Sequence, residues 1–340
     1  MKLQDIYLLS PEISLAGLAL IIVVLDVFIK NKILVQSVIG IGLLVPVILS
    51  VLLWNGIGIQ AELDSNNQVF GLFNTLVVDK FTLLFKFLFL GILSIVMISS
   101  VSYAHRFEKT KMEYFSLLMF ATVGMMLLAS TRELITIYIS LELTALPMAV
   151  LISISGNKLS SESGIKFLIL SAISSALLLY GMVWVYGLTG TTDVAEIFHS
   201  IEGMSRQNGD LSNTAFGNYG LLLGVILIVA GFGFKISSVP FHMWVPDVYQ
   251  GAPTPITAFL SVASKAAGFA VILRVFYGSF SSESLSIEWS MIFAIMAVLS
   301  MAIGNFVAIS QKNIKRLLAY STIAHAGYIM MGLTVVSSRM

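Results

Sequence analysis

Long apolar runs alternate with short polar breaks along nearly the whole chain. A bilayer core of about 30 Å requires about 20 apolar residues per helix, and about ten segments of this length recur. The expected spans are Ile13–Ile29, Ile33–Leu53, Phe81–Tyr103, Met112–Ser130, Leu134–Ser155, Ile165–Leu188, Tyr219–Pro240, Ile256–Tyr277, Trp289–Ile309 and Leu317–Val336. The pattern therefore predicts an all-α polytopic membrane protein, with residues 1–340 forming a single membrane domain.

Composition also indicates a membrane protein, and it excludes several kinds of binding site. The sequence is 57% hydrophobic and only 11% charged, whereas soluble domains carry about 25% charged residues. A net charge of +1 gives no sign of nucleic-acid binding, and the absence of cysteine excludes disulfides and thiolate metal sites. No phosphate-binding loop, metalloprotease motif or pair of membrane histidines is present, so we expect neither a cofactor nor a metal in this chain.

The charges of the connecting segments alternate in sign with nearly every span. Basic residues cluster on one side, at Lys30, Lys32, Arg106, Lys109, Lys111, Lys158, Lys312, Lys315 and Arg316. Acidic residues predominate on the other, at Glu62, Asp64, Asp193, Glu196, Glu202, Asp210, Glu283 and Glu288. Because basic loops stay on the cytoplasmic side, this asymmetry predicts that the N-terminus lies outside.

Three expected spans place a titratable residue near the middle of the bilayer. Glu142 lies nine residues beyond Glu133, which corresponds to about 14 Å along a helix. Lys265 and His325 fall at similar depths in the eighth and tenth spans. A charge at the bilayer centre costs about 2.5 to 3.5 kcal/mol, so such residues are functional candidates. His325 alone could instead be an interhelical hydrogen-bonding residue.

A fourth candidate, Lys235, lies in a span of unusual form. The segment from Tyr219 to Gln250 has too many residues for one span and too few for two, and Pro240 and Pro246 would interrupt a regular helix. We therefore expect a broken seventh helix. Irregular backbone at membrane depth survives where it is buried in protein or lines a wet cavity, and transport sites often form there.

Other ionisable residues have simpler interpretations. Asp26 is expected to form an interfacial pair with Lys30, and Lys86 is expected to reach the outer edge with its flexible stem. Two interpretations remain open for Lys166 and His242. Lys166 is either functional or a residue near the cytoplasmic edge, and His242 is either a relay member or a hydrogen-bonding residue at a helix end. For the central charges, the rival interpretation is a static buried salt bridge, but such a bridge contributes little net stability and requires no helix break.

The sequence resembles a known family in several segments. The match is carried by FGFKISSVPFHMWVPDVYQGAPTPITAFLSVASKAAGFAVILRVF, by SLELTALPMAVL, by SGIKFLILSAISSALLLYG and by QKNIKRLLAYSTIAHAGYIMMGL. These segments resemble, in the same order, the N-type antiporter-like subunits of proton-translocating NADH:quinone oxidoreductase, respiratory complex I. The motif VPDVYQGAPTP separates this type from its longer relatives. The resemblance covers nearly the whole chain and is less specific in residues 1–100.

The resemblance implies an antiporter-like fold of leading helices followed by two inverted five-helix repeats. Residues 1–110 would form leading helices one to three, residues 111–280 the first repeat, and residues 281–340 the start of the second. Family members continue through further helices, so the second repeat is incomplete in this sequence. A fragment or a truncated variant is expected on this basis.

The resemblance also implies roles for individual residues. Glu142 matches the fifth-helix glutamate, Lys235 the broken-helix lysine, and Lys265 the eighth-helix lysine that passes protons laterally. Lys166 matches the modulating sixth-helix lysine, and His325 a tenth-helix member of the central polar axis. The implied activity is proton translocation without a redox centre in this chain.

The expected partners are other membrane subunits of complex I and the lipid bilayer, with NADH, flavin, iron–sulfur clusters and quinone on partner subunits. The expected location is an energy-transducing membrane, such as a bacterial inner membrane. Two alternatives use the same observations. The chain could be a subunit of a multisubunit cation/proton antiporter, or a structural or assembly-only membrane subunit with inert charges.

Overall fold

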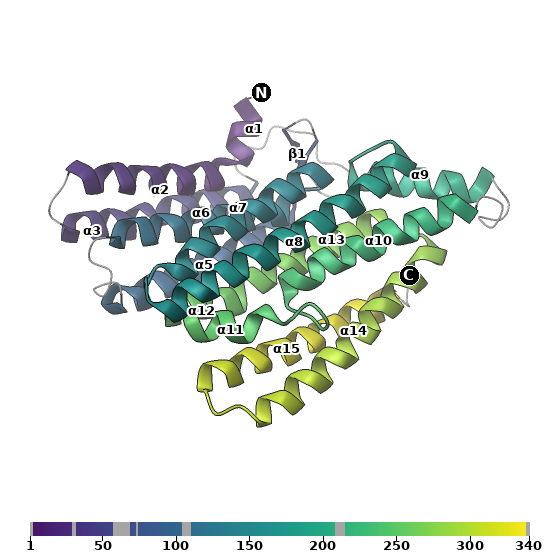
Figure 1. Ribbon diagram of the computed structural model, residues 1–340. Coiled ribbons are helices and arrows are strands. Elements are labelled where there is room, and N and C mark those ends of the chain that lie inside the picture. Colours follow the sequence, from purple (N-terminus) through teal and green to yellow (C-terminus); the bar gives the residue numbers. More distant parts are fainter. Residues whose placement is uncertain are drawn as a thin grey trace. The chain divides into compact units, whose positions relative to one another are not determined.

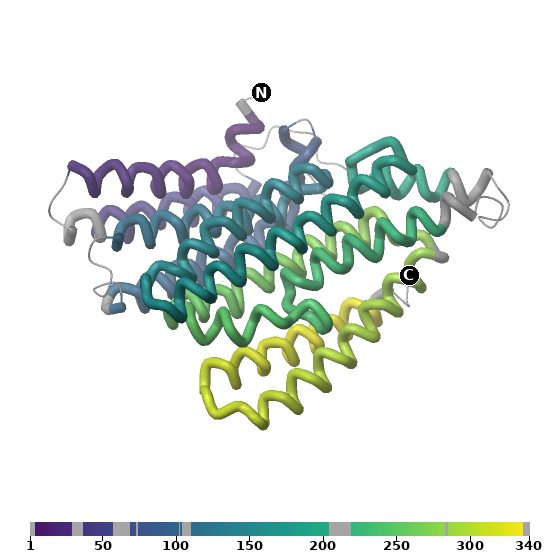
Figure 2. Tube along the Cα trace, viewed as in Figure 1, coloured from purple at the N-terminus to yellow at the C-terminus, as the bar shows by residue number. Residues whose placement is uncertain are grey.

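The computed structural model is almost entirely helical (Figure 1). It describes residues 3–28, 32–56, 69–72, 74–103, 110–207 and 215–337, and Figure 2 draws the less certain positions in grey. Within the described residues, nine helices are long and apolar enough to cross a membrane. The tenth expected span is also a helix, α15, but polar residues such as Ser321 and His325 make it less apolar than the other nine.

The chain divides into two compact units. We call residues Met1–Thr131, Ile139–Gly164 and Ala252–Ala267 the first unit, and Arg132–Tyr138, Ile165–Gly251 and Gly268–Met340 the second unit. The helices α7, α8 and α13 each contribute residues to both units.

The first unit is built mainly from the N-terminal helices. Its elements are α1 Leu3–Leu8, α2 Ser10–Phe28, α3 Lys32–Gly42, α4 Leu44–Trp54, β1 Val69–Gly71, β2 Leu76–Val78, α5 Lys80–Tyr103, α6 Lys111–Ser130, most of α7 Leu134–Ser153, α12 Thr254–Phe259 and the π-helical turn η3 Leu260–Ser264. The antiparallel strands β1 and β2 form a short hairpin outside the expected spans.

Helix α6 is the most buried span of the first unit. It packs against α2 and α5, and the Ser116 hydroxyl donates to the Ala19 carbonyl oxygen of α2 at 3.0 Å. A Cβ on Gly124 would lie 2.8 Å from Thr144 Cγ2, so α6 and α7 pack at a distance that only glycine permits. Small residues at helix contacts are typical of membrane proteins, where close van der Waals packing replaces the hydrophobic effect between helices.

The second expected span is interrupted at Leu43, between α3 and α4. Pro46 explains the interruption, because a proline lacks the N–H that would bond to the carbonyl four residues earlier, at Gly42, and its ring clashes with that carbonyl. The structure therefore adds a second helix break that the apolar pattern did not predict.

The second unit contains most of α8 Lys158–Thr189, α9 Val194–Gln207, α10 Ala215–Ile236, α11 Trp244–Gly251, most of α13 Lys265–Ser279, α14 Glu283–Ile309 and α15 Ile314–Ser337. Helices α14 and α15 lie side by side (Figure 1). A Cβ on Gly304 would lie 2.8 Å from the Ala324 backbone nitrogen, so these two backbones are also in close contact. The aromatic rings of Phe276, Trp289 and Phe293 pack together between α13 and α14.

Candidate functional site

The expected break in the seventh helix is present. Helix α10 ends at Ile236 and α11 begins at Trp244. Ser237 has a φ of 63°, its N–H donates to the Phe234 carbonyl at 3.0 Å, and the Ser238 N–H donates to the Gly233 carbonyl at 2.9 Å. This pair of bonds is a Schellman cap, which satisfies carbonyls at the end of a helix. Glycine usually occupies the left-handed position, and a serine there costs about 1 to 3 kcal/mol.

Two polar side chains bond further backbone groups of the break. The Val239 N–H donates to the Ser300 hydroxyl oxygen of α14 at 2.9 Å, and the Trp244 indole N–H donates to the Phe234 carbonyl oxygen at 3.2 Å. The N–H groups of Ser237, Ser238 and Val239, which follow the end of α10, are therefore all bonded within the protein. Irregular backbone can exist at membrane depth only where its N–H and C=O groups are hydrogen-bonded in this way.

Lys235 lies in the last turn of α10, next to this break, and is partly buried. The carbonyl end of a helix carries partial negative charge, which stabilises an ammonium group there. Its stem packs against α13, because a Cβ on Gly268 would lie 3.3 Å from Lys235 Cγ and 2.7 Å from Ile236 Cγ2. A larger residue at position 268 would displace the lysine or its neighbour.

Lys265 is buried and begins α13, directly after the π-helical turn η3. A π turn inserts an extra residue into a helix, disturbs the regular bonding, and occurs frequently at functional sites. The apolar pattern predicted a regular eighth helix. The signal available in the sequence was only the segment of small and hydroxyl residues at 261–264, which does not distinguish a π turn from an ordinary one.

Glu142 lies on α7 within the first unit and is partly buried. Two residues later, Thr144 faces Gly124 of α6, and Pro147 lies inside the same helix. Because a proline removes the bond to the carbonyl four residues earlier, the carbonyl of Leu143 loses its ordinary helical partner. The backbone next to Glu142 is thus locally more polar than in a regular span.

His325 is exposed on α15, where its ring contacts Tyr328 with centroids 5.9 Å apart. Of the five predicted residues, Glu142 and Lys265 belong to the first unit, whereas Lys166, Lys235 and His325 belong to the second. Their assignment to one proton path stays a prediction.

Lys166 belongs to a charge cluster that the sequence analysis did not anticipate. Its Nζ lies 3.0 Å from Asp247 Oδ2, and Arg316 Nη1 lies 2.7 Å from Asp247 Oδ1. Arg316 also donates to the side-chain oxygens of Gln250 at 3.1 Å and Gln311 at 3.3 Å. We call these five residues the Asp247 cluster. It joins α8, α11 and α15 and lies wholly within the second unit.

Asp247 remains ionised in this cluster. Helix α11 lies outside the nine candidate spans, and the Asp247 side chain is about one-third exposed. Burial alone would raise the pKa of Asp247, but hydrogen bonds and charge interactions with Lys166 and Arg316 outweigh it and hold the pKa below the ordinary value of an aspartate. One carboxylate therefore balances two cations.

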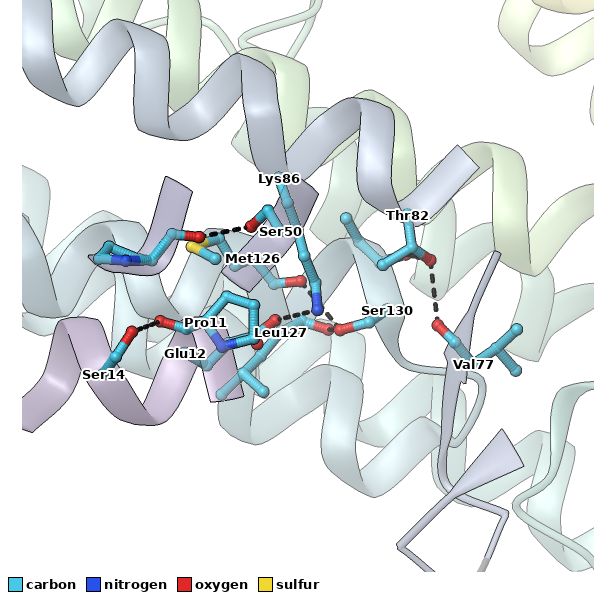
Figure 3. Close-up of polar contacts among 12 residues, drawn as sticks. Pro11, Glu12, Ser14, Ser50, Val77, Thr82, Lys86, Met126, Leu127 and Ser130 are labelled. Atoms are coloured by element: carbon cyan, nitrogen blue, oxygen red, sulfur yellow. Dashed lines mark hydrogen bonds and ion pairs between the residues drawn. The ribbon is translucent and has the colours of Figure 1, made fainter. Parts of the chain in front are cut away.

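The expected outer-edge position of Lys86 is wrong. Lys86 of α5 is fully buried, and its Nζ lies 2.8 Å from Glu12 Oε1 of α2 (Figure 3). The flexible stem turns inward because the carboxylate of Glu12, at the start of its helix, offers a buried partner of opposite charge. The apolar pattern placed Glu12 just outside the first span and so missed the pair.

Two further residues can be compared with their expected roles. His242 is buried in the break and makes a backbone hydrogen bond with Pro240, while its Nδ1 has no partner among the described residues. Lys30, the expected partner of Asp26, lies outside the described residues. In the part of the chain that the structure describes, no group of three or more acidic, histidine or cysteine side chains could hold a metal ion.

The family model described as "NADH:quinone oxidoreductase/Mrp antiporter, TM" matches residues 130–340, more than half of the chain. The chain belongs to this family. The matched range includes all five predicted site residues, the helix break and the whole Asp247 cluster.

Curated relatives in this family are named NADH-quinone oxidoreductase subunit N. The chain is 41% identical to that of Dehalococcoides mccartyi over 97% of its own length and 66% of the relative's. It is 44% identical to that of Desulforamulus reducens, with 86% of this chain and 60% of the relative covered. For Moorella thermoacetica the identity is 47%, over 77% of this chain and 52% of the relative. The chain thus spans about half to two-thirds of the length of these relatives.

Solved structures agree with the fold. A chain of respiratory complex I from Thermus thermophilus with bound aureothin matches with a TM-score of 0.74 and 29% identity, over 95% of this chain and 64% of that one. A chain of the Mrp complex from Dietzia sp. DQ12-45-1b matches with a TM-score of 0.72 and 19% identity, over 98% and 59%. The second likeness concerns the fold alone. The chain is an integral, multi-pass membrane protein of the antiporter-like fold.

Proposed function

We propose that this chain acts in an antiporter-like membrane subunit of respiratory complex I and carries protons while partner subunits transfer electrons from NADH to quinone. The observation that carries the proposal is Lys235, a lysine in the last turn of a helix that breaks within a membrane protein of this family. The names of the subunit N relatives support the same complex.

Lys235 is the proposed proton carrier. Burial disfavours an ammonium ion, whereas the helix end and an ionised carboxylate favour it, so a change in either interaction captures or releases a proton. We assign the carboxylate role to Glu142. Moving one charge against 100 mV requires about 2.3 kcal/mol, which is within the range of a single ion-pair interaction near a protein surface, about 4 kcal/mol at 4 Å.

The other candidates extend this path. Lys265, at the π turn, would take the proton onward, and His325 would belong to the continuation of the polar axis. Lys166 would modulate the charge of Glu142. The exposed position of His325 leaves it available to groups outside the described residues.

The proposed setting follows from the family. Other membrane subunits would contact this chain, and NADH, flavin, iron–sulfur clusters and quinone would reside on partner subunits. The membrane would be a bacterial inner membrane, with the N-terminus outside as the basic loops indicate. We further propose leading helices at 1–110, a first five-helix repeat at 111–280 and the start of an inverted second repeat at 281–340.

A second candidate is a subunit of a multisubunit cation/proton antiporter. It is favoured by the family model, which covers both classes, and by the likeness of fold to the Mrp complex. Copurification decides between them, because complex I membership requires iron–sulfur and quinone-reactive subunits to travel with this chain. Sodium-dependent transport by vesicles without those subunits would instead establish the antiporter. A purely structural subunit would tolerate neutralisation of its buried charges.

Substitution of Glu142 tests the ion-pair mechanism. Glu142→Gln keeps the shape and removes the charge, whereas Glu142→Asp keeps the charge and shortens its reach. Proton pumping per electron in proteoliposomes of the whole complex should fall more for Gln than for Asp. If the Gln variant pumps better than the Asp variant, packing rather than charge is the role of Glu142.

A further inference from the structure

The motif VPDVYQGAPTP identifies the family, yet the proposed function assigns no task to its polar side chains. In the structure, two of them, Asp247 and Gln250, lie on α11 and contact Arg316 of α15. Asp247 also contacts Lys166 of α8 through its other carboxylate oxygen. The motif therefore bonds to a lysine that the resemblance marks as functional.

The two cations of the Asp247 cluster are held differently. Arg316 is fixed by side-chain oxygens from Asp247, Gln250 and Gln311. A guanidinium group presents its donors in a rigid fork, which suits such multiple contacts. Lys166 approaches the opposite oxygen of Asp247 with a flexible stem, and its side chain is 43% exposed. An ammonium group is a point charge that can change partner, so Lys166 is the movable cation of the cluster.

We propose that Asp247, held in place by Arg316, is a positioning residue for Lys166 and sets when this lysine can act on proton transfer. This inference rests on the proposed function, in which Lys166 modulates Glu142. The carboxylate would hold Lys166 in one position and release it when the charges along the proton path change. Arg316 would prevent Asp247 from following the lysine.

A simple structural role is the competing interpretation, because the cluster also connects α8, α11 and α15. A structural connection alone predicts loss of assembly or of overall yield. A positioning role predicts a change in protons pumped per electron in complexes that assemble normally, and it predicts that Asp247 acts only through Lys166.

The test uses the whole complex in proteoliposomes, with pumping and electron transfer measured together. Asp247→Asn should lower the protons pumped per electron to about the level of Lys166→Met, because the neutral amide no longer attracts the Lys166 ammonium. Asp247→Glu, which keeps the charge, should restore most of the ratio. The double variant Asp247→Asn/Lys166→Met should be no worse than Lys166→Met alone. Lys158→Ala is the control, because it removes an exposed lysine at the start of the same helix α8 and leaves the Asp247 cluster unchanged.

An unchanged ratio in Asp247→Asn, or additive losses in the double variant, would overturn the inference. If the Asn variant does not assemble, Asp247→Ser provides a second neutral side chain, and a normal ratio there has the same meaning. Failure of the broader proposal looks different, because Lys166→Met and Lys235→Ala would then both pump normally. If Lys166→Met and Lys235→Ala pump poorly but Asp247→Asn pumps normally, the positioning role of Asp247 is rejected and the proposed function is not.

Discussion

Two groups of charged side chains, each within one unit of the chain, differ in burial and in the number of partners. Glu12 and Lys86 form a one-to-one pair whose side chains are only 3% and 1% exposed (Figure 3). In the Asp247 cluster, one carboxylate serves two cations, and Lys166 and Asp247 are 43% and 35% exposed. The first group is enclosed by the protein, whereas the second lies partly open at the surface of this chain.

The difference separates a fixed ion pair from an exchangeable one. Desolvated charges cost several kcal/mol each, so a buried ion that loses its partner is strongly destabilised. A half-exposed pair is worth about 0 to 1 kcal/mol, because water screens the charges and solvates a released ammonium. A half-exposed ammonium can therefore change partner at little cost, whereas a buried pair resists separation and holds its two helices together.

The largest expected effect is on the buried pair. Lys86→Met leaves the Glu12 carboxylate buried without its cation and should destabilise the protein by about 3 to 5 kcal/mol. Thermal unfolding of the purified protein in detergent measures the loss. The double variant Lys86→Met/Glu12→Leu replaces both charges by apolar groups and should recover most of the stability. Equal stability of the single variant and the unmodified protein would contradict a fixed pair.

The matching substitution in the Asp247 cluster should have a smaller effect. Lys166→Met leaves Asp247 paired with Arg316, so the cost should be about 0 to 1 kcal/mol. The same unfolding measurement applies, and added salt should reduce the difference further because exposed charges are screened. A loss as large as that of Lys86→Met would show that the two regions do not differ as described.

The smallest effect concerns pH. Because Lys166 and Arg316 hold the pKa of Asp247 below its ordinary value in the folded protein, its charge stabilises the fold above the pKa of the unfolded chain, and this contribution is lost as the pH falls through the folded pKa. The stability difference between the unmodified protein and Asp247→Asn should therefore be constant between about pH 5 and 8 and begin to decline as the pH falls below about 4. A difference that declines between pH 5 and 8 would mean that Asp247 titrates in that range.

Much of the fold could be predicted, because each apolar run is long enough to cross a bilayer and each polar break is charged. The break after Lys235 was visible as well, since Pro240 cannot continue α10, whereas Pro246 lies in the first turn of α11, where a proline is tolerated. The π turn before Lys265 was not, because Leu260–Ser264 contains ordinary helix residues and the turn depends on tertiary packing. Helix α9 and the hairpin β1–β2 were missed because they lie in polar connections.

The site was predicted only in part, because its side-chain contacts also depend on tertiary packing. Depth along a span selects single residues such as Glu142 and Lys235, but it gives no information about side-chain direction. Lys86 was expected to reach solvent, yet it turns inward to Glu12. The partnership of Lys166 with Asp247 joins residues 81 positions apart, and no periodicity along the chain indicates such a contact.

Proton pumping by a Lys235→Ala variant tests the central claim most directly. The complex containing this chain would be reconstituted in liposomes, and protons translocated per electron would be compared with those of Lys158→Ala, which removes an exposed lysine at the start of α8. We predict a reduced ratio for Lys235→Ala, continued electron transfer and a normal ratio for the control. An unchanged ratio in an assembled Lys235→Ala complex would contradict the account.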